Sequence, residues 1–236
     1  MLGTTAASRR PMTELAEGAR VLVIEAPDLA AARASWSVFP AIPTVELRLG
    51  VIDGLIDSLA ADGTLDGRRI ARVSVRAPED AAALLALPHA LEVEVVLSRS
   101  SEAWLLGLSS IPARLSLRQP TYERLTEAAE HDVDLPAFFA RFRHDVPVRG
   151  VPACILGRAP DADPRVLDTT MRTAEGALEI FRYTRRFILD HYRTKSRRCR
   201  ACTHDASCAG LHINQVRAHG YAWMQPVAPA TCAAAE

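Results

Sequence analysis

The sequence predicts an α/β fold, and three observations lead to that prediction. Short apolar segments alternate with segments in which apolar residues recur at helical spacing. This alternation occurs six times in succession, with strand starts near residues 20, 45, 70, 91, 113 and 146. Three of the junctions place a proline before a polar residue, which suits the first turn of a helix. Strands and helices that alternate in this way build parallel sheets.

The individual elements follow from the same pattern. The six expected strands lie at 19–27, 44–50, 69–78, 91–99, 113–120 and 146–157. The expected helices lie at 28–36, 51–63, 79–87, 100–108, 121–130 and 136–142. Six consecutive units favour a partial (βα)6 barrel of TIM-like type, and an open doubly wound sheet is the alternative. No glycine-rich G-x-G-x-x-G loop follows any strand, so a dinucleotide-binding domain is not expected.

Beyond the sixth strand the pattern changes. A long amphipathic helix is expected at 166–194, and it leads into a segment rich in cysteine. The predicted organisation is a flexible arm (1–18), a partial α/β barrel (19–157), a long helix with a small cysteine-rich metal-binding domain (158–227) and a tail (228–236).

The cysteines are the strongest chemical signal in the chain. Cys199, Cys202 and Cys208 form a C-x2-C-x5-C pattern, although the whole chain contains only five cysteines. Two thiolates of a C-x2-C turn can reach one metal centre, and the longer spacer can return a third. Cys154 is the expected fourth ligand, and Cys232 is a weaker candidate.

The identity of the metal stays open on the residues alone. An iron–sulfur cluster is the preferred interpretation, and zinc is the alternative, for which His204 and His212 would also suit. A protein without metal is the third possibility. Cys154, in an apolar segment, could then be a small buried hydrophobic residue.

Composition and charge limit the function classes. A net charge of zero argues against a protein that grips nucleic acid with its whole surface. No stretch reaches the roughly 18 apolar residues needed to cross a bilayer, and the N-terminus has no apolar signal region. We therefore expect a cytoplasmic protein, in which clustered cysteines act as ligands rather than as disulfides.

Arginine recurs near the ends of the predicted strands. The positions are Arg48, Arg76, Arg99, Arg118 and Arg149. In parallel α/β folds ligands bind at this edge, so the arginines predict a rim for a carboxylate, a phosphate or an acidic peptide. The alternative is pairing with neighbouring acids, among them Glu25, Glu46, Glu92 and Glu94.

These features together resemble a known family. Six βα units, a strand that carries V-P-x-C, a long helix and C-x2-C-x5-C-x-G are similar to radical SAM proteins with a twitch- or SPASM-type C-terminal domain. The segment 219–227, HGYAWMQPV, resembles the one that follows the cysteines in some of those proteins. The resemblance covers about residues 20–227 and is specific over 147–227. It implies that Cys154 and the three clustered cysteines hold an auxiliary [4Fe-4S] cluster.

The chain departs from the family at the core site. The family's C-x3-C-x2-C motif should follow the first strand, where this chain reads IEAPDLAAARASW without cysteine. After the second strand it reads RLGVIDGL, where the family has a G-G-E-P-like turn. SAM binding and SAM cleavage are therefore doubtful.

The leading hypothesis is a degenerate radical SAM-like iron–sulfur protein. It would be an accessory or substrate-binding partner of an active maturation enzyme, with a peptide or small anionic ligand and with neither nucleic acid nor membrane as partner. One alternative is an active enzyme, radical SAM-type or other, on a small anionic or peptide substrate. Another is a zinc-stabilised interaction protein. Enzymatic activity stays uncertain, and the absent core motif argues against it.

Overall fold

The structure is a computed structural model that describes residues 21–37, 39, 42–59, 62–161, 167–168, 173 and 178–228. The predicted arm (1–18), the tail from residue 229 and Cys232 lie outside the described residues. The chain divides into two compact units. The first takes the described residues of Met1–Val73, His89–Leu91 and Pro164–Arg186, and the second those of Ser74–Pro88, Glu92–Asp163 and Phe187–Glu236. The predicted division near residue 157 stays a prediction.

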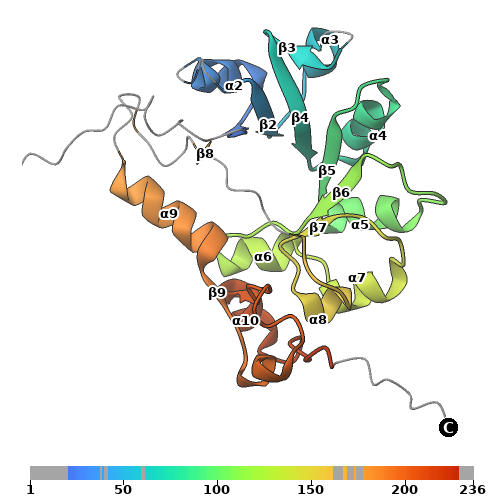
Figure 1. The fold of residues 1–236 in the computed structure, drawn as a ribbon, viewed down its shortest axis with the longest axis vertical. Helices are drawn as coiled ribbons and strands as arrows, with labels where there is room; N and C mark the ends of the chain where they lie inside the picture. Colours follow the sequence, from blue (N-terminus) through green and yellow to red (C-terminus); the bar gives the residue numbers. More distant parts are fainter. Residues whose placement is uncertain are drawn as a thin grey trace, which may run out of the picture. The chain divides into compact units, whose positions relative to one another are not determined.

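The first unit contains a parallel group of strands (Figure 1). Its elements are β1 (Leu22–Ala26), α2 (Leu29–Trp36), β2 (Thr44–Leu49), α3 (Leu55–Ser58), β3 (Thr64–Leu65), most of β4 (Arg68–Val75) and β8 (Leu167–Asp168). The strand order is β4-β2-β1-β8, and β1 pairs in parallel with both of its neighbours. Helix α2 packs on β1 and β2.

The second unit continues with the same type of structure and adds the cysteine-rich segment. Its sheet part comprises α4 (Pro78–Ala86), β5 (Glu92–Val96), α5 (Arg99–Leu106), β6 (Leu115–Arg118), α6 (Leu125–His131), α7 (Leu135–Arg141), β7 (Val148–Arg149) and α8 (Ala153–Leu156). Its C-terminal part comprises β9 (Arg193–Thr194), the 3-10 helix η2 (Arg197–Ala201), β10 (Leu211–His212) and α10 (Ile213–His219). Helix α9 (Ile180–His191) has residues in both units. The strands β5, β6 and β7 pair in parallel in sequence order.

These elements confirm the α/β class. The predicted strands correspond to β1, β2, β4, β5, β6 and β7, and each of the six predicted helices overlaps one helix of the structure, namely α2, α3, α4, α5, α6 and α7. The helix starts follow from local chemistry. The Asp28 carboxylate accepts a hydrogen bond from the amide of Ala31 (2.8 Å) and caps α2, while Pro78 opens α4.

The sixth strand is much shorter than predicted. Strand β7 ends at Arg149, and Cys154 lies in the short helix α8 and not on a strand. Gly150 ends the strand with a φ of +76°. Its position against the carbonyl oxygen of Gln119 leaves no room for a Cβ atom, so the turn requires glycine. Pro152 then caps the helix that carries Cys154.

Two predicted helices also begin in the wrong place. Helix α6 starts at Leu125 and not at 121, because the carbonyls of Tyr122 and Glu123 accept hydrogen bonds from the Asn214 side chain (2.7 and 3.1 Å). Those carbonyls are thus satisfied outside a helix. The predicted helix at 166–194 is wrong at 167–168, where β8 pairs with β1. Within the described residues its helical part is α9.

The structure contains one hairpin that the sequence analysis does not predict. Strand β3 pairs antiparallel with β4 across Asp66 and Gly67, which both have positive φ. An Asp-Gly pair is the preferred sequence of a two-residue hairpin turn, so this signal was present in the chain. Only residues 55–58 of the helix predicted at 51–63 are helical.

Some strand positions are polar although they are buried. Residues two apart share a face of a strand, as Ser116 and Arg118 do on β6. Buried polar residues on β1 to β7 are Glu46, Arg72, Ser74, Glu94, Ser116 and Arg149. In the first unit, an Arg72 Nη1–Glu46 Oε2 ion pair (2.9 Å) neutralises two of these charges.

Candidate metal centre

The cysteine loop is built by a succession of tight turns. Cys199 lies in η2, and Cys202 ends it by donating its amide to the carbonyl oxygen of Cys199 (2.9 Å). A further turn brings Cys208 back, since its amide donates to the carbonyl oxygen of His204 (2.9 Å). The spacing C-x2-C-x5-C therefore follows two local turns, as the sequence predicted.

The ends of this loop are held together by the β9–β10 pair. Thr194 is opposite Leu211 in this antiparallel ladder. Gly210 has a φ of +83°, and a Cβ atom there would lie 2.1 Å from the carbonyl oxygen of Thr194. Only glycine fits at this position, because the loop closes directly against the strand.

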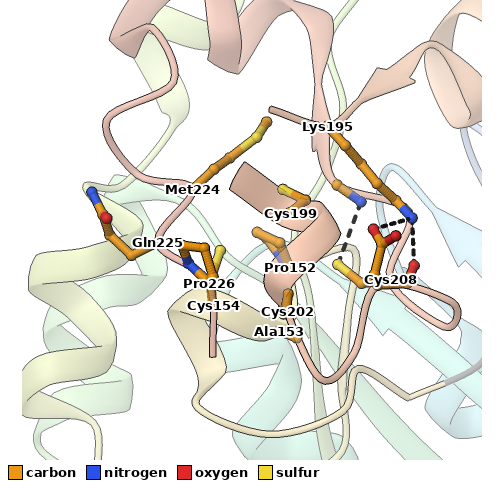
Figure 2. A pocket seen from close by; sticks show the side chains of 12 residues that line it. Pro152, Ala153, Cys154, Lys195, Cys199, Cys202, Cys208, Met224, Gln225 and Pro226 are labelled. Carbon is orange, nitrogen blue, oxygen red and sulfur yellow. Dashed lines mark hydrogen bonds and ion pairs between the residues drawn. The ribbon is translucent and has the colours of Figure 1, made fainter. Parts of the chain in front are cut away.

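A third segment brings Cys154 to the same place. Four of the five cysteines line one pocket in the second unit, whose free volume, open solvent included, is about 330 Å³. Figure 2 shows Cys154 from α8 together with the three cysteines of the loop. The other lining residues are Pro152, Ala153, Lys195, Asp205, Gly210, Met224, Gln225 and Pro226. All four thiols are free and partly buried.

Polar groups surround the sulfur atoms. The amide of Gly210 donates to Cys208 Sγ (3.4 Å), and the amide of Val227 donates to Cys202 Sγ (3.4 Å). The Cys154 thiol donates to the carbonyl oxygen of Trp223 (3.5 Å). N–H groups directed at sulfur stabilise thiolates and tune clusters that thiolates hold.

The segment 221–227 contributes Met224, Gln225 and Pro226 to the pocket lining and is hydrogen-bonded to the loop at two positions. The amide of Ser196 donates to Met224 Sδ (3.2 Å), and the amide of Thr203 donates to the carbonyl oxygen of Val227 (3.0 Å). This segment lies within the stretch HGYAWMQPV singled out in the sequence. Its position gives that stretch a physical role, which is to enclose the cysteines.

The electrostatics of Cys154 reflect the convergence of the thiols. Burial raises the pKa of the Cys154 thiol, and charge on Cys208 and Cys199 raises it further, while a hydrogen bond from the Gln225 backbone opposes the rise. The surroundings of Cys154 therefore favour its neutral thiol in the metal-free protein.

The described side chains do not form a ready-made site for one metal ion. A single zinc ion with Zn–S bonds near 2.3 Å needs its tetrahedral sulfur ligands about 3.8 Å apart. Among the residues that the structure describes, no three or more Cys, His, Asp or Glu side chains are arranged to hold one metal ion. The four thiols therefore share a pocket without being arranged around a single ion.

The two histidines considered for zinc are placed differently. His212 Nε2 is hydrogen-bonded to the carbonyl oxygen of Ile188 (2.8 Å), and Nδ1 accepts from the amide of Asn214 (3.4 Å). Both ring nitrogens therefore serve to cap α10 and fix the preceding helix. His204 does not line the pocket.

The charged residues that line the pocket are Asp205 and Lys195, the only lysine in the chain. Its Nζ pairs with Asp205 Oδ1 (3.1 Å) and also donates to the carbonyl oxygen of Asp205 (Figure 2). The site predicted from the sequence does not include Lys195. Its distinct chemistry among so many arginines was the available signal.

The predicted arginine rim is divided between the two units. Arg48, in the first unit, lies 4.0 Å from Glu25. In the second unit Arg118 Nε pairs with Glu94 Oε1 (2.7 Å), and Arg149 Nη1 with Glu94 Oε2 (3.3 Å). Pairing with Glu25 and Glu94, the alternative considered above, is thus confirmed for these three.

The remaining two rim arginines differ from these. Arg99 is the first residue of α5, and its Nε donates to the carbonyl oxygen of Asp132 (3.1 Å). Arg76 follows β4 and is exposed. Glu46 pairs with Arg72, which was not a rim candidate.

In comparisons of the chain with known protein families, curated proteins and solved structures, none matched. In the part of the chain that the structure describes, we find no helix with the length and apolar character needed to cross a membrane.

Proposed function

We propose that the chain is a degenerate radical SAM-like protein with one [4Fe-4S] cluster on Cys154, Cys199, Cys202 and Cys208. It would combine a partial (βα)6 barrel with a small C-terminal cysteine-rich domain, and act in the cytoplasm as an accessory or substrate-binding partner of an active maturation enzyme. One observation carries the cluster assignment. Four of the five cysteines, from two segments far apart in the sequence, line the same pocket.

The polar strand positions support the barrel. In a doubly wound sheet helices cover both faces, and the strands are then close to uniformly apolar. Here Glu94 is 1% exposed at the centre of β5 and receives two arginines, while Ser116 beside it is also buried. A buried polar face of this kind suits the interior of a barrel. The sequential order β5-β6-β7 within the second unit agrees with barrel winding.

The chain's own groups are suited to hold a negatively charged centre. The amides of Gly210 and Val227 donate to sulfur, and the Lys195 ammonium group lines the pocket. A cluster held by four cysteines supplies electron transfer or a structural cross-link, because no iron is left without a protein ligand. On ligation Cys154 would lose its proton and its hydrogen bond to Trp223.

The accessory role follows from what the sequence lacks. No C-x3-C-x2-C motif occurs in the chain, so no cysteine triad is available for a SAM cluster. The chain retains the proposed barrel and one candidate cluster site. We expect such a protein to bind a peptide or small anionic ligand for a partner enzyme.

Anaerobic purification and reconstitution with iron and sulfide test the proposal. We expect about four irons and four sulfides per chain, with the absorption and, after reduction, the EPR spectrum of a [4Fe-4S] cluster. The variants Cys154→Ser and Cys208→Ser should each lose most of the iron. Cys232→Ser is the matched control and should keep it.

The alternatives give different results. A protein that stays colourless and free of iron after reconstitution would falsify the cluster assignment. One zinc per chain without visible absorption would instead identify a zinc-stabilised interaction protein. Formation of 5′-deoxyadenosine from SAM on reduction would contradict the accessory role and indicate an active enzyme.

A further inference from the structure

Positive charge is concentrated in the part of the chain that carries the cysteine loop. Residues 191–228 contain six arginine or lysine residues and a single acidic residue, Asp205, although the whole chain has a net charge of zero. The Asp205 carboxylate is paired with Lys195 (3.1 Å). This part of the second unit therefore has an excess of positive charge that its own acidic residues do not neutralise.

The short helix η2 presents its arginines away from the cysteine pocket. A 3-10 helix has about three residues per turn, so Arg197 and Arg200 lie on one face and Arg198 lies on the next. Cys199 takes the third face and lines the pocket. The three arginines are exposed, and among the described residues no carboxylate lies within ion-pair distance of any of them. Like charges on one helix face repel each other, so an anionic partner would stabilise this surface.

Arg198 connects η2 to exposed aromatic residues. Its Nη2 donates to the carbonyl oxygen of Tyr221 (2.8 Å), and its Nη1 donates to Gln225 Oε1 (3.4 Å). Tyr221 is 45% exposed. In the same segment the Trp223 ring stacks on the exposed ring of His219, with the centroids 3.8 Å apart. Arginine, tyrosine and tryptophan are the residues that most often contribute the binding energy of protein interfaces.

The extent of the surface favours a protein partner over nucleic acid. Proteins that bind single strands follow the backbone with a long basic groove, whereas here the exposed arginines belong to one five-residue helix. Arg197 and Arg200 are separated by one turn, which suits two neighbouring carboxylates of a peptide. Tyr221 beside them suits an apolar side chain of the same peptide.

We propose that η2 and the segment 221–225 form a docking surface for an acidic segment of a partner protein. Carboxylates of that segment pair with Arg197 and Arg200, and an apolar side chain of it packs on Tyr221. Arg198 holds the two parts of the surface together through its hydrogen bonds. The inference rests on the proposed accessory role, for which it names the surface and the kind of partner, but it does not depend on a metal in the pocket.

Fluorescence anisotropy of a labelled peptide of Glu-Glu-Leu repeats, titrated with the full chain, tests the inference. A peptide of Gln-Gln-Leu repeats is the control ligand and should not bind. We expect saturable binding that weakens when salt is raised from about 0.1 M to about 1 M, because the screening length then falls from about 10 Å to about 3 Å. Arg197→Gln combined with Arg200→Gln should weaken binding about tenfold. Tyr221→Ala should also weaken it.

Arg33→Gln combined with Arg69→Gln is the matched control, since it removes the same charge from the first unit. It should leave the affinity unchanged. The inference is overturned if the acidic peptide does not bind, or if the two double variants weaken binding equally. Tighter binding of an oligodeoxythymidylate or of phosphatidylserine vesicles than of the peptide also overturns it. Iron analysis of the same preparation separates the two proposals, because peptide binding without iron refutes only the cluster, and iron without peptide binding refutes only the docking surface.

Discussion

Replacing Gly210 by alanine should detach the cysteine loop from β9. A Cβ atom at Gly210 would lie 2.1 Å from the carbonyl oxygen of Thr194 and 3.1 Å from Cγ of Lys195. Left-handed backbone costs a non-glycine residue about 1–2 kcal/mol. The overlap with a backbone oxygen is relieved only by moving β10 from β9, which gives up about two hydrogen bonds of about 1 kcal/mol each. We therefore expect a loss of about 3–4 kcal/mol in the free energy of unfolding.

Gly157→Ala is the matched control. Gly157 ends α8 with a φ of +71°, but no heavy atom lies within 4 Å of an added Cβ. This variant should lose only the conformational cost of about 1 kcal/mol. Urea unfolding measures both changes, and the rate at which a thiol reagent modifies the metal-free protein shows whether the cysteine loop has opened. Equal losses in the two variants would refute the reasoning from the Thr194 contact.

Three further predictions address charge and capping. Glu94→Gln should destabilise the second unit by about 3–5 kcal/mol in a urea titration, because two arginines lose a buried partner. Glu25→Gln is the control, because Glu25 is 53% exposed in its ion pair, and it should cost less than about 1 kcal/mol in the same titration. Asp28→Ala should lower the free energy of unfolding by about 1 kcal/mol through loss of the α2 cap, which thermal melting can measure. Burial raises the pKa of Asp132 from 3.8 to about 6, against a hydrogen bond from Gln119. The stability that its retained proton contributes is therefore complete below the unfolded pKa and is lost as pH rises through about 6. Melting temperatures between pH 4 and 7 should show this decline, and Asp132→Asn should flatten it; an unchanged profile in the variant would contradict the assignment.

The elements that the sequence predicts well are those with local causes. Strand β1 is an apolar run, and the Asp28 cap and Pro78 mark helix starts within a few residues. The errors lie where distant contacts decide. Gly150 ends β7 because it meets Gln119, and Asn214 delays α6 by binding the carbonyls before it. No local pattern contains such contacts.

For the candidate metal centre, too, the sequence predicts the features that have local causes and misses those that depend on distant contacts. The spacing of Cys199, Cys202 and Cys208 is local, so the sequence alone could group them, and Cys154 was the expected fourth ligand from its place on the predicted sixth strand. That Cys154 reaches the same pocket depends on packing in the second unit.

One arginine, Arg193, links the cysteine loop to the loop that follows β7. Arg193 Nη1 donates to the carbonyl oxygens of Gly150 and Gly210, both at 3.1 Å, so it joins the loop after β7 to the loop that carries Cys208. Asn214 makes a second connection, from α10 to the carbonyl oxygen of Tyr122 (2.7 Å). Both loops therefore depend on the same guanidinium group, and a displacement of either one removes a hydrogen bond from Arg193.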